Sequence, residues 1–71
     1  MSEYVVIYEL AEDGGWGAYI PDLPGVVALG TTRAEVAERI QEALSAYADD
    51  LRRRGRSLPV PHHAAGTVVA A

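Results

Sequence analysis

The stretch Ala18-Tyr-Ile-Pro-Asp-Leu-Pro-Gly25 decides how the rest of this 71-residue chain is arranged. Pro21 and Pro24 each fix φ and lack a backbone donor, so the stretch is neither a helix nor the middle of a sheet. Gly25 permits a backbone turn that other residues resist. Because β-forming residues lie on both sides, we predict a rigid corner between two strands.

Three strand-like segments surround this corner. Residues 4–10 are rich in β-branched and aromatic side chains, and residues 16–20 and 26–29 flank the corner. The glycine-containing link at 11–15 predicts a β-hairpin. Both faces of the first segment are largely apolar. That segment is therefore central and covered on both sides, or one of its faces meets another subunit.

A long helix is predicted to follow. Thr32 and Glu35 form a Thr-x-x-Glu capping box, and Gly55 has the place of a helix terminator. Between them an apolar stripe recurs at spacings of three and four, made of Val36, Ala37, Ile40, Leu44, Tyr47, Ala48 and Leu51. Residues 67–70 are a possible fourth strand. The order β-β-β-α-β predicts an α+β fold, a three- to four-stranded mainly antiparallel sheet with one long helix packed on one face.

Charge is unevenly distributed along the chain. The net charge is −4, but all ten acids lie within residues 1–50, whose only basic residues are Arg33 and Arg39. An acidic body disfavours nucleic acid and favours a basic partner. The alternative is that the acids only keep the protein soluble. No apolar run approaches the length of a membrane span, so we expect a cytoplasmic protein without a membrane contact.

No set of residues predicts catalysis. Cysteine is absent, and the strands and corner offer only Glu9 and Asp22, too few carboxylates for a metal-dependent nuclease. Asp22, between two prolines, is expected to bond its own backbone in a turn, with a partner contact as the alternative. His62 and His63 would point to opposite faces of an extended segment, so we interpret them as a flexible polar tail. We expect no enzyme activity, no cofactor and no metal.

The order of these residues resembles a known family. Glu12-Asp-Gly-Gly-Trp-Gly-Ala-Tyr-Ile-Pro-Asp-Leu-Pro-Gly25, followed by Val-Val-Ala-Leu-Gly-Thr-Thr-Arg-Ala-Glu35, is similar to the N-terminal domain of HicB antitoxins. The resemblance implies a partial RNase-H-like fold without nuclease carboxylates. It also implies a non-catalytic protein that binds and neutralises a HicA toxin, a small basic protein that cleaves mRNA. The family motif falls on Tyr19, Pro21, Asp22, Leu23, Pro24 and Gly25, and the expected partner-binding acids are Glu35, Glu38, Glu42 and Asp22.

The chain departs from this family at two places. Val26 stands where the family often has cysteine, and the DNA-binding module that many members carry after this domain is not expected here. We therefore expect residues 1–71 to form a single HicB-like domain without direct DNA binding, with 61–71 as a loosely ordered tail or an edge strand.

Two further functions remain open from the sequence. The first is a solitary HicB-like regulatory or ligand-binding domain that works as a homo-oligomer, a dimer or a tetramer, without a toxin. The second is RNA binding through the cluster Arg52–Arg56 with stacking on Tyr19 or Trp16. Basic residues at a helix end more often match the helix dipole, which weighs against RNA.

Overall fold

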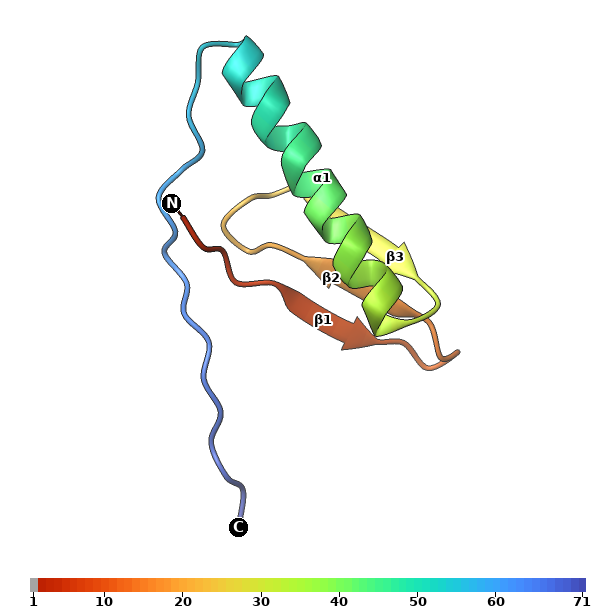
Figure 1. Ribbon diagram of the computed structural model, residues 1–71. Helices are drawn as coiled ribbons and strands as arrows, with labels where there is room; N and C mark the ends of the chain where they lie inside the picture. Colours follow the sequence, from red (N-terminus) through yellow and green to blue (C-terminus); the bar gives the residue numbers. More distant parts are fainter. Residues whose placement is uncertain (1) are drawn as a thin grey trace.

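Three short strands and one long helix follow each other along the chain in the computed structural model, which describes residues 2–71 (Figure 1). The strands are β1 (Ile7–Leu10), β2 (Trp16–Tyr19) and β3 (Val27–Gly30), and the helix is α1 (Arg33–Arg53). The predicted three strands and helix are confirmed. β1 begins three residues later than the sequence predicted.

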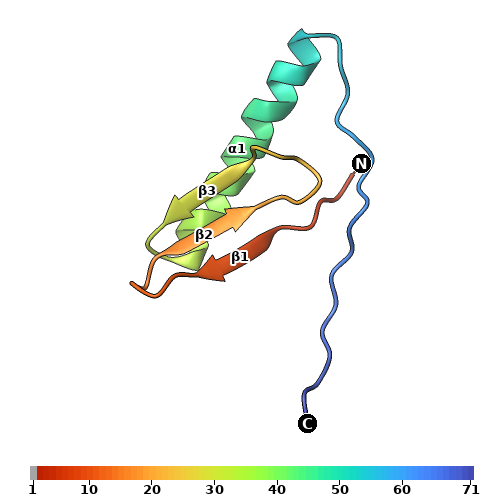
Figure 2. The ribbon, with the colours of Figure 1, turned by 180° about the vertical axis from the view of Figure 1, so that it is seen from behind.

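The sheet is antiparallel, with the order β1-β2-β3. Ala18 in the central strand lies opposite Tyr8 of β1 and Ala28 of β3. Figure 2 shows the sheet from the side that α1 does not cover. The helix packs mainly on β2 and β3, so one face of the sheet is buried and the other is open.

The corner between β2 and β3 consists of two consecutive turns that share Leu23. The Leu23 N–H donates to the Ile20 carbonyl, and the Val26 N–H donates to the Leu23 carbonyl, each at 3.0 Å. A proline holds the second position of each turn, where its fixed φ fits. Gly25 has a φ of 95°, the positive value that the third position of the second turn requires. The corner turns Leu23 inward, where its side chain is completely buried.

The core lies between the corner, the sheet and the first half of the helix. Val36 is completely buried and Ile40 is 4% exposed, so the predicted apolar stripe of α1 faces the sheet. The buried cluster is made of Ala18, Ile20, Leu23, Val26, Ala28, Val36 and Ile40.

The helix begins and ends as the sequence predicts. Thr32 Oγ1 accepts a hydrogen bond from the Glu35 N–H at 3.1 Å. The Glu35 carboxylate returns this contact one residue earlier than a standard capping box, accepting from the Thr31 N–H at 2.8 Å. At the other end, Gly55 follows the cap with a φ of 72°.

The fourth strand expected at residues 67–70 does not form in the chain. Residues 56–71 are irregular and extended. They first return from the end of α1 past the start of the chain, and residues 64–71 then run away from the sheet in both views (Figures 1 and 2). A strand needs a neighbouring edge to pair with, and this segment has none beside it. Among residues 2–71, no helix combines the length and the apolar character that crossing a membrane requires.

Candidate functional site

The Asp22 carboxylate fastens the C-terminal tail to the corner. Its Oδ2 accepts hydrogen bonds from the His62 N–H at 3.0 Å and the His63 N–H at 3.3 Å. Its Oδ1 accepts from His63 Nδ1 at 2.7 Å. These bonds leave the Asp22 side chain 4% exposed. Asp22 therefore bonds a segment 40 residues later in the chain, where the sequence led us to expect its own turn.

This geometry shifts the pKa of the Asp22 carboxyl group. Burial by itself raises the pKa of Asp22, but the hydrogen bonds from His62 and His63 outweigh burial and hold the pKa below its ordinary value. The carboxylate is therefore ionised at neutral pH and acts only as an acceptor. We call Asp22, His62 and His63 the tail clamp.

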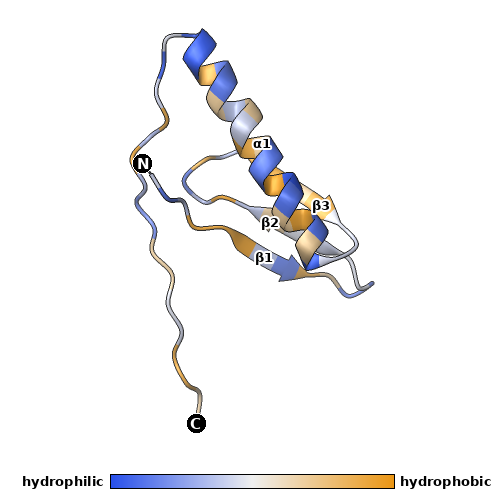
Figure 3. Ribbon diagram, in the orientation of Figure 1, coloured by the Kyte–Doolittle hydropathy of each residue, from blue (hydrophilic) through white to orange (hydrophobic). Residues whose placement is uncertain are grey.

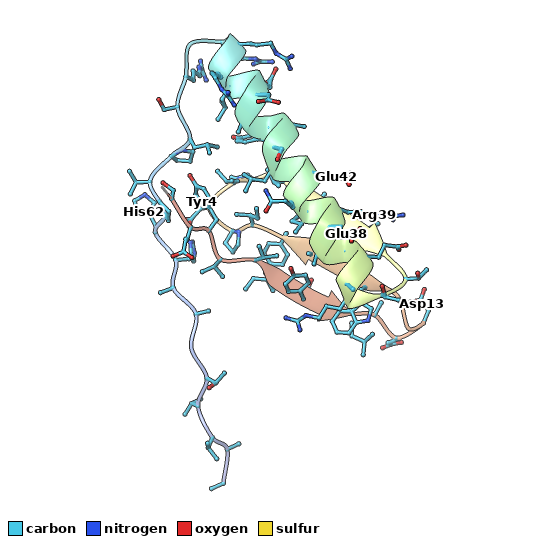
Figure 4. The ribbon with its side chains drawn as sticks, in the orientation of Figure 1. Tyr4, Asp13, Glu38, Arg39, Glu42 and His62 are labelled. Carbon is cyan, nitrogen blue, oxygen red and sulfur yellow. The ribbon has the colours of Figure 1, made fainter. Side chains whose placement is uncertain are left out.

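A second contact supports the tail clamp. The Tyr4 hydroxyl donates to the Pro59 carbonyl, and Leu58 packs against the core cluster. The tail passes the start of the chain in both ribbon views (Figures 1 and 2), and Tyr4 and His62 are labelled in Figure 4. The tail is thus held at residues 58–63, and residues 64–71 after them are exposed.

The histidine pair was interpreted from the sequence as a flexible tail, and that interpretation is wrong at these two positions. Both backbone amides, and one ring, are bound to Asp22. The only signal in the sequence is an acid inside a rigid corner, and nothing in the spacing links it to residues 62–63.

The acids named as partner-binding residues occupy different environments. Glu35 is engaged at the helix start, where the Thr31 N–H and then Arg39 lower its pKa. Asp22 is engaged in the tail clamp. Glu38 and Glu42 are exposed on α1, one helical turn apart, and are labelled in Figure 4. We call Glu38 and Glu42 the acidic pair.

An apolar surface lies on the β2–β3 part of the open face of the sheet. Tyr19 and Val27 are opposite each other in the register and are 39% and 60% exposed. Leu29, on the same face, is 74% exposed. Exposed apolar patches on small domains mark contact surfaces when they are contiguous. We call Tyr19, Val27 and Leu29 the open-face patch.

The hairpin end of the sheet carries a shallow hollow of about 530 Å³. Its lining includes Glu9, Trp16 and Leu29. The Asp13 carboxylate at its rim accepts from the Gly15 N–H at 2.9 Å, so it stabilises the turn. Within residues 2–71, no group of three histidine or acidic side chains is arranged to hold a metal ion.

Comparison with protein families identifies the family of this chain, and two curated proteins are similar to it in sequence. The pattern of the family described as HicB-like antitoxin of bacterial toxin-antitoxin system matches residues 4–70. UPF0150 protein Ta0767 of Thermoplasma acidophilum is 35% identical over 57 residues, which are 80% of this chain and 83% of that protein. UPF0150 protein ssl0738 of Synechocystis is 37% identical over 49 residues, 69% of this chain and 68% of that protein.

A solved structure shares the fold. The N-terminal domain of the Burkholderia pseudomallei antitoxin HicB superposes with a TM-score of 0.70 at 21% identity, covering 87% of this chain and 69% of that one. Three antiparallel strands followed by one long helix are common to both.

Proposed function

The chain belongs to the HicB-like antitoxins of bacterial toxin-antitoxin systems, and on this premise we propose that it binds and neutralises a small basic toxin of the HicA type that cleaves mRNA. The observation that carries the proposal is the family match over residues 4–70, which includes the strands, the corner and the helix. The proposed action is binding alone, without catalysis by this chain. It takes place in the cytoplasm, where mRNA is available.

Charge supports a basic partner. Residues 1–50, which form the sheet and most of the helix, hold all ten acids of the chain. Opposite charge across an interface steers encounter and favours the right partner, and its effect weakens as salt rises. An acidic protein and a basic toxin are therefore electrostatically suited.

The acidic pair is the part of the expected partner-binding set that is free to make such a contact. Glu38 and Glu42 are exposed, whereas the Asp22 and Glu35 carboxylates already accept hydrogen bonds within the chain. We therefore propose the exposed face of α1 as the toxin-binding surface, with Glu38 and Glu42 at its centre. The order of three strands and a helix also supports the expectation of a partial RNase-H-like core.

The test begins with a small basic protein encoded beside this one. The two are mixed, binding is measured by calorimetry, and cleavage of an RNA by the basic protein is followed with and without this chain. We expect binding and loss of cleavage. If the two do not bind, or cleavage continues in the complex, the proposed function is wrong.

A charge-reversal experiment tests the surface separately. The double variant Glu38→Lys and Glu42→Lys should bind the toxin more weakly and should lose part of the salt dependence. The matched control is Glu3→Lys with Glu12→Lys, which changes the net charge equally at exposed positions outside the helix. Equal weakening by both pairs would show that overall charge, and not this face of α1, governs the contact.

A separate observation supports a second candidate function. The open-face patch is apolar and exposed, although a single small domain gains by covering such a surface. This favours a homo-oligomeric regulatory or ligand-binding domain that works without a toxin. Sedimentation that shows a single chain at micromolar concentration would count against it.

A further inference from the structure

The tail contains a strand-forming segment that pairs with no strand among residues 2–71. Thr67-Val-Val-Ala70 has a β-branched composition, yet Val68 and Val69 are 93% and 94% exposed. Figure 3 colours the end of the tail toward the hydrophobic side of the scale, although it extends alone. Such a segment is stabilised when it adds to the edge of a sheet.

The backbone of β1 offers an open edge. The Ala11 N–H donates to the Gly15 carbonyl at 2.8 Å, at the end of the hairpin. Bonded and non-bonded pairs alternate along an antiparallel ladder, so the register turns the backbone groups of Tyr8 and Leu10 outward, away from β2. Leu10 is also 62% exposed. This edge can therefore accept another strand.

The edge of β3 is partly closed. The Ile20 N–H donates to the Val26 carbonyl at 3.2 Å, so by the same alternation the backbone groups of Val27 and Leu29 point outward. Arg39 Nη1 donates to the Leu29 carbonyl at 2.6 Å. A charged side chain over an edge carbonyl hinders the approach of another strand.

We infer that the segment 67–70 of one copy of this chain pairs with the β1 edge of a second copy. The segment is the donor and the edge is the acceptor, and every copy carries both. Reciprocal exchange then closes a two-fold dimer, in which each tail extends the sheet of its partner. This pairing would be the contact between chains in the homo-oligomer of the second candidate function. It does not depend on a toxin.

The lack of charge on the tail permits a second copy as the occupant. Two copies with a net charge of −4 repel each other, so their contact must avoid the acidic surfaces. Residues 57–71 contain no Asp, Glu, Lys or Arg, and Glu9 is the only charged residue of β1. The uncharged tail is thus the part of the chain that can best contact a second copy of this acidic protein. A basic toxin would instead bind the acidic surfaces.

The geometry of the tail fits an exchange between copies. The tail clamp ends at His63, and residues 64–71 run away from their own β1 in both views (Figures 1 and 2). These residues can reach about 26 Å when extended, about twice the length of a four-residue strand. Adjacent valines point to opposite faces of a strand, so one of Val68 and Val69 would cover each side of the extended sheet.

The experiment measures the mass of the full chain by sedimentation over a concentration series. We expect a two-chain mass for the unchanged protein. Val68→Asp with Val69→Asp should halve it, because charges in the paired segment oppose association. Both positions are exposed in the single chain, so this variant cannot disturb the core. The matched control, Ala64→Asp with Ala65→Asp, places the same charges outside the pairing segment and should keep the two-chain mass.

The acceptor edge is tested with proline. Leu10→Pro removes an outward N–H from β1 and should also halve the mass, whereas Leu29→Pro at the β3 edge should not. Thermal unfolding confirms that each variant is folded. If both the variant Val68→Asp with Val69→Asp and the variant Leu10→Pro keep the two-chain mass, this pairing is wrong, although the protein is still a homo-oligomer. A single-chain mass of the unchanged protein would overturn both, and neither result bears on toxin binding.

Discussion

The Asp22 carboxylate and the His63 ring, 41 positions apart in the chain, meet at 2.7 Å at the corner between β2 and β3. The same carboxylate also accepts both backbone amides of His62 and His63. One acid in a rigid turn thus determines where the tail leaves the domain.

Asp22→Asn should loosen the tail without unfolding the domain. The amide keeps one acceptor oxygen but loses the charge that strengthens three hydrogen bonds. We expect faster hydrogen exchange at the amides of residues 62–63 and an unchanged rate in α1. Asp49→Asn is the control, because Asp49 lies on the exposed helix face and pairs only with nearby Arg52. Unchanged exchange in the tail of Asp22→Asn would contradict the tail clamp.

Acid should release the tail clamp. The pKa of Asp22 is held below its ordinary value of 3.8, so the clamp contributes stability that is fully present above that pH. The contribution is lost as pH falls through the lower, folded-state pKa of Asp22. The NMR shift of the His62 amide should therefore show a change below about pH 4, where Asp22 takes up its proton. Asp22→Asn should abolish this change, and a transition near neutral pH would point to another group.

Gly30→Ala should destabilise the junction between β3 and the helix. A Cβ at this position would lie 2.9 Å from Val36 Cγ2 and 2.5 Å from Glu35 Oε1. Val36 is completely buried and cannot move aside, so we expect a loss of about 1–3 kcal/mol in the free energy of unfolding. Gly66→Ala is the matched control, because a Cβ there meets nothing within 4 Å. Equal unfolding midpoints in denaturant for the two variants would refute this packing.

Ile40→Asp should prevent folding. Ile40 is 4% exposed within the core, and an unpaired carboxylate there loses its hydration without a partner. Circular dichroism should show no cooperative unfolding transition. Ser45→Asp introduces the same side chain at an exposed position of α1 and should unfold near the unchanged midpoint. A cooperative transition of Ile40→Asp near that midpoint would mean that the helix has another face toward the sheet.

The local signals in the sequence predicted most of the fold. Thr32 and Gly55 marked the ends of α1 because capping depends on residues close in the chain. The two prolines and Gly25 predicted the corner for the same reason. These features need only the chemistry of a few neighbouring residues, so they can be recognised without the fold.

The parts that sequence reasoning missed depend on distant residues. The tail clamp joins Asp22 to residues 40 and 41 positions later, and no periodicity reports such a contact. The possible fourth strand at 67–70 is absent from the structure, because a strand depends on a neighbouring edge and residues 2–71 bring none to this segment. Charge does not distinguish among the expected partner-binding acids, and only the structure separates Glu35, which accepts a hydrogen bond within the chain, from the exposed Glu38 and Glu42.

The order of the strands has a consequence for how the chain folds. Each strand pairs with the next one along the sequence, and α1 begins only three residues after β3 ends. Forming the sheet and covering it therefore requires only short loops to close, which favours rapid folding. The bonds from Asp22 to the tail instead close a loop of 40 residues and cost more chain entropy. We expect the tail to dock last and to detach first, while the rest of the domain stays folded.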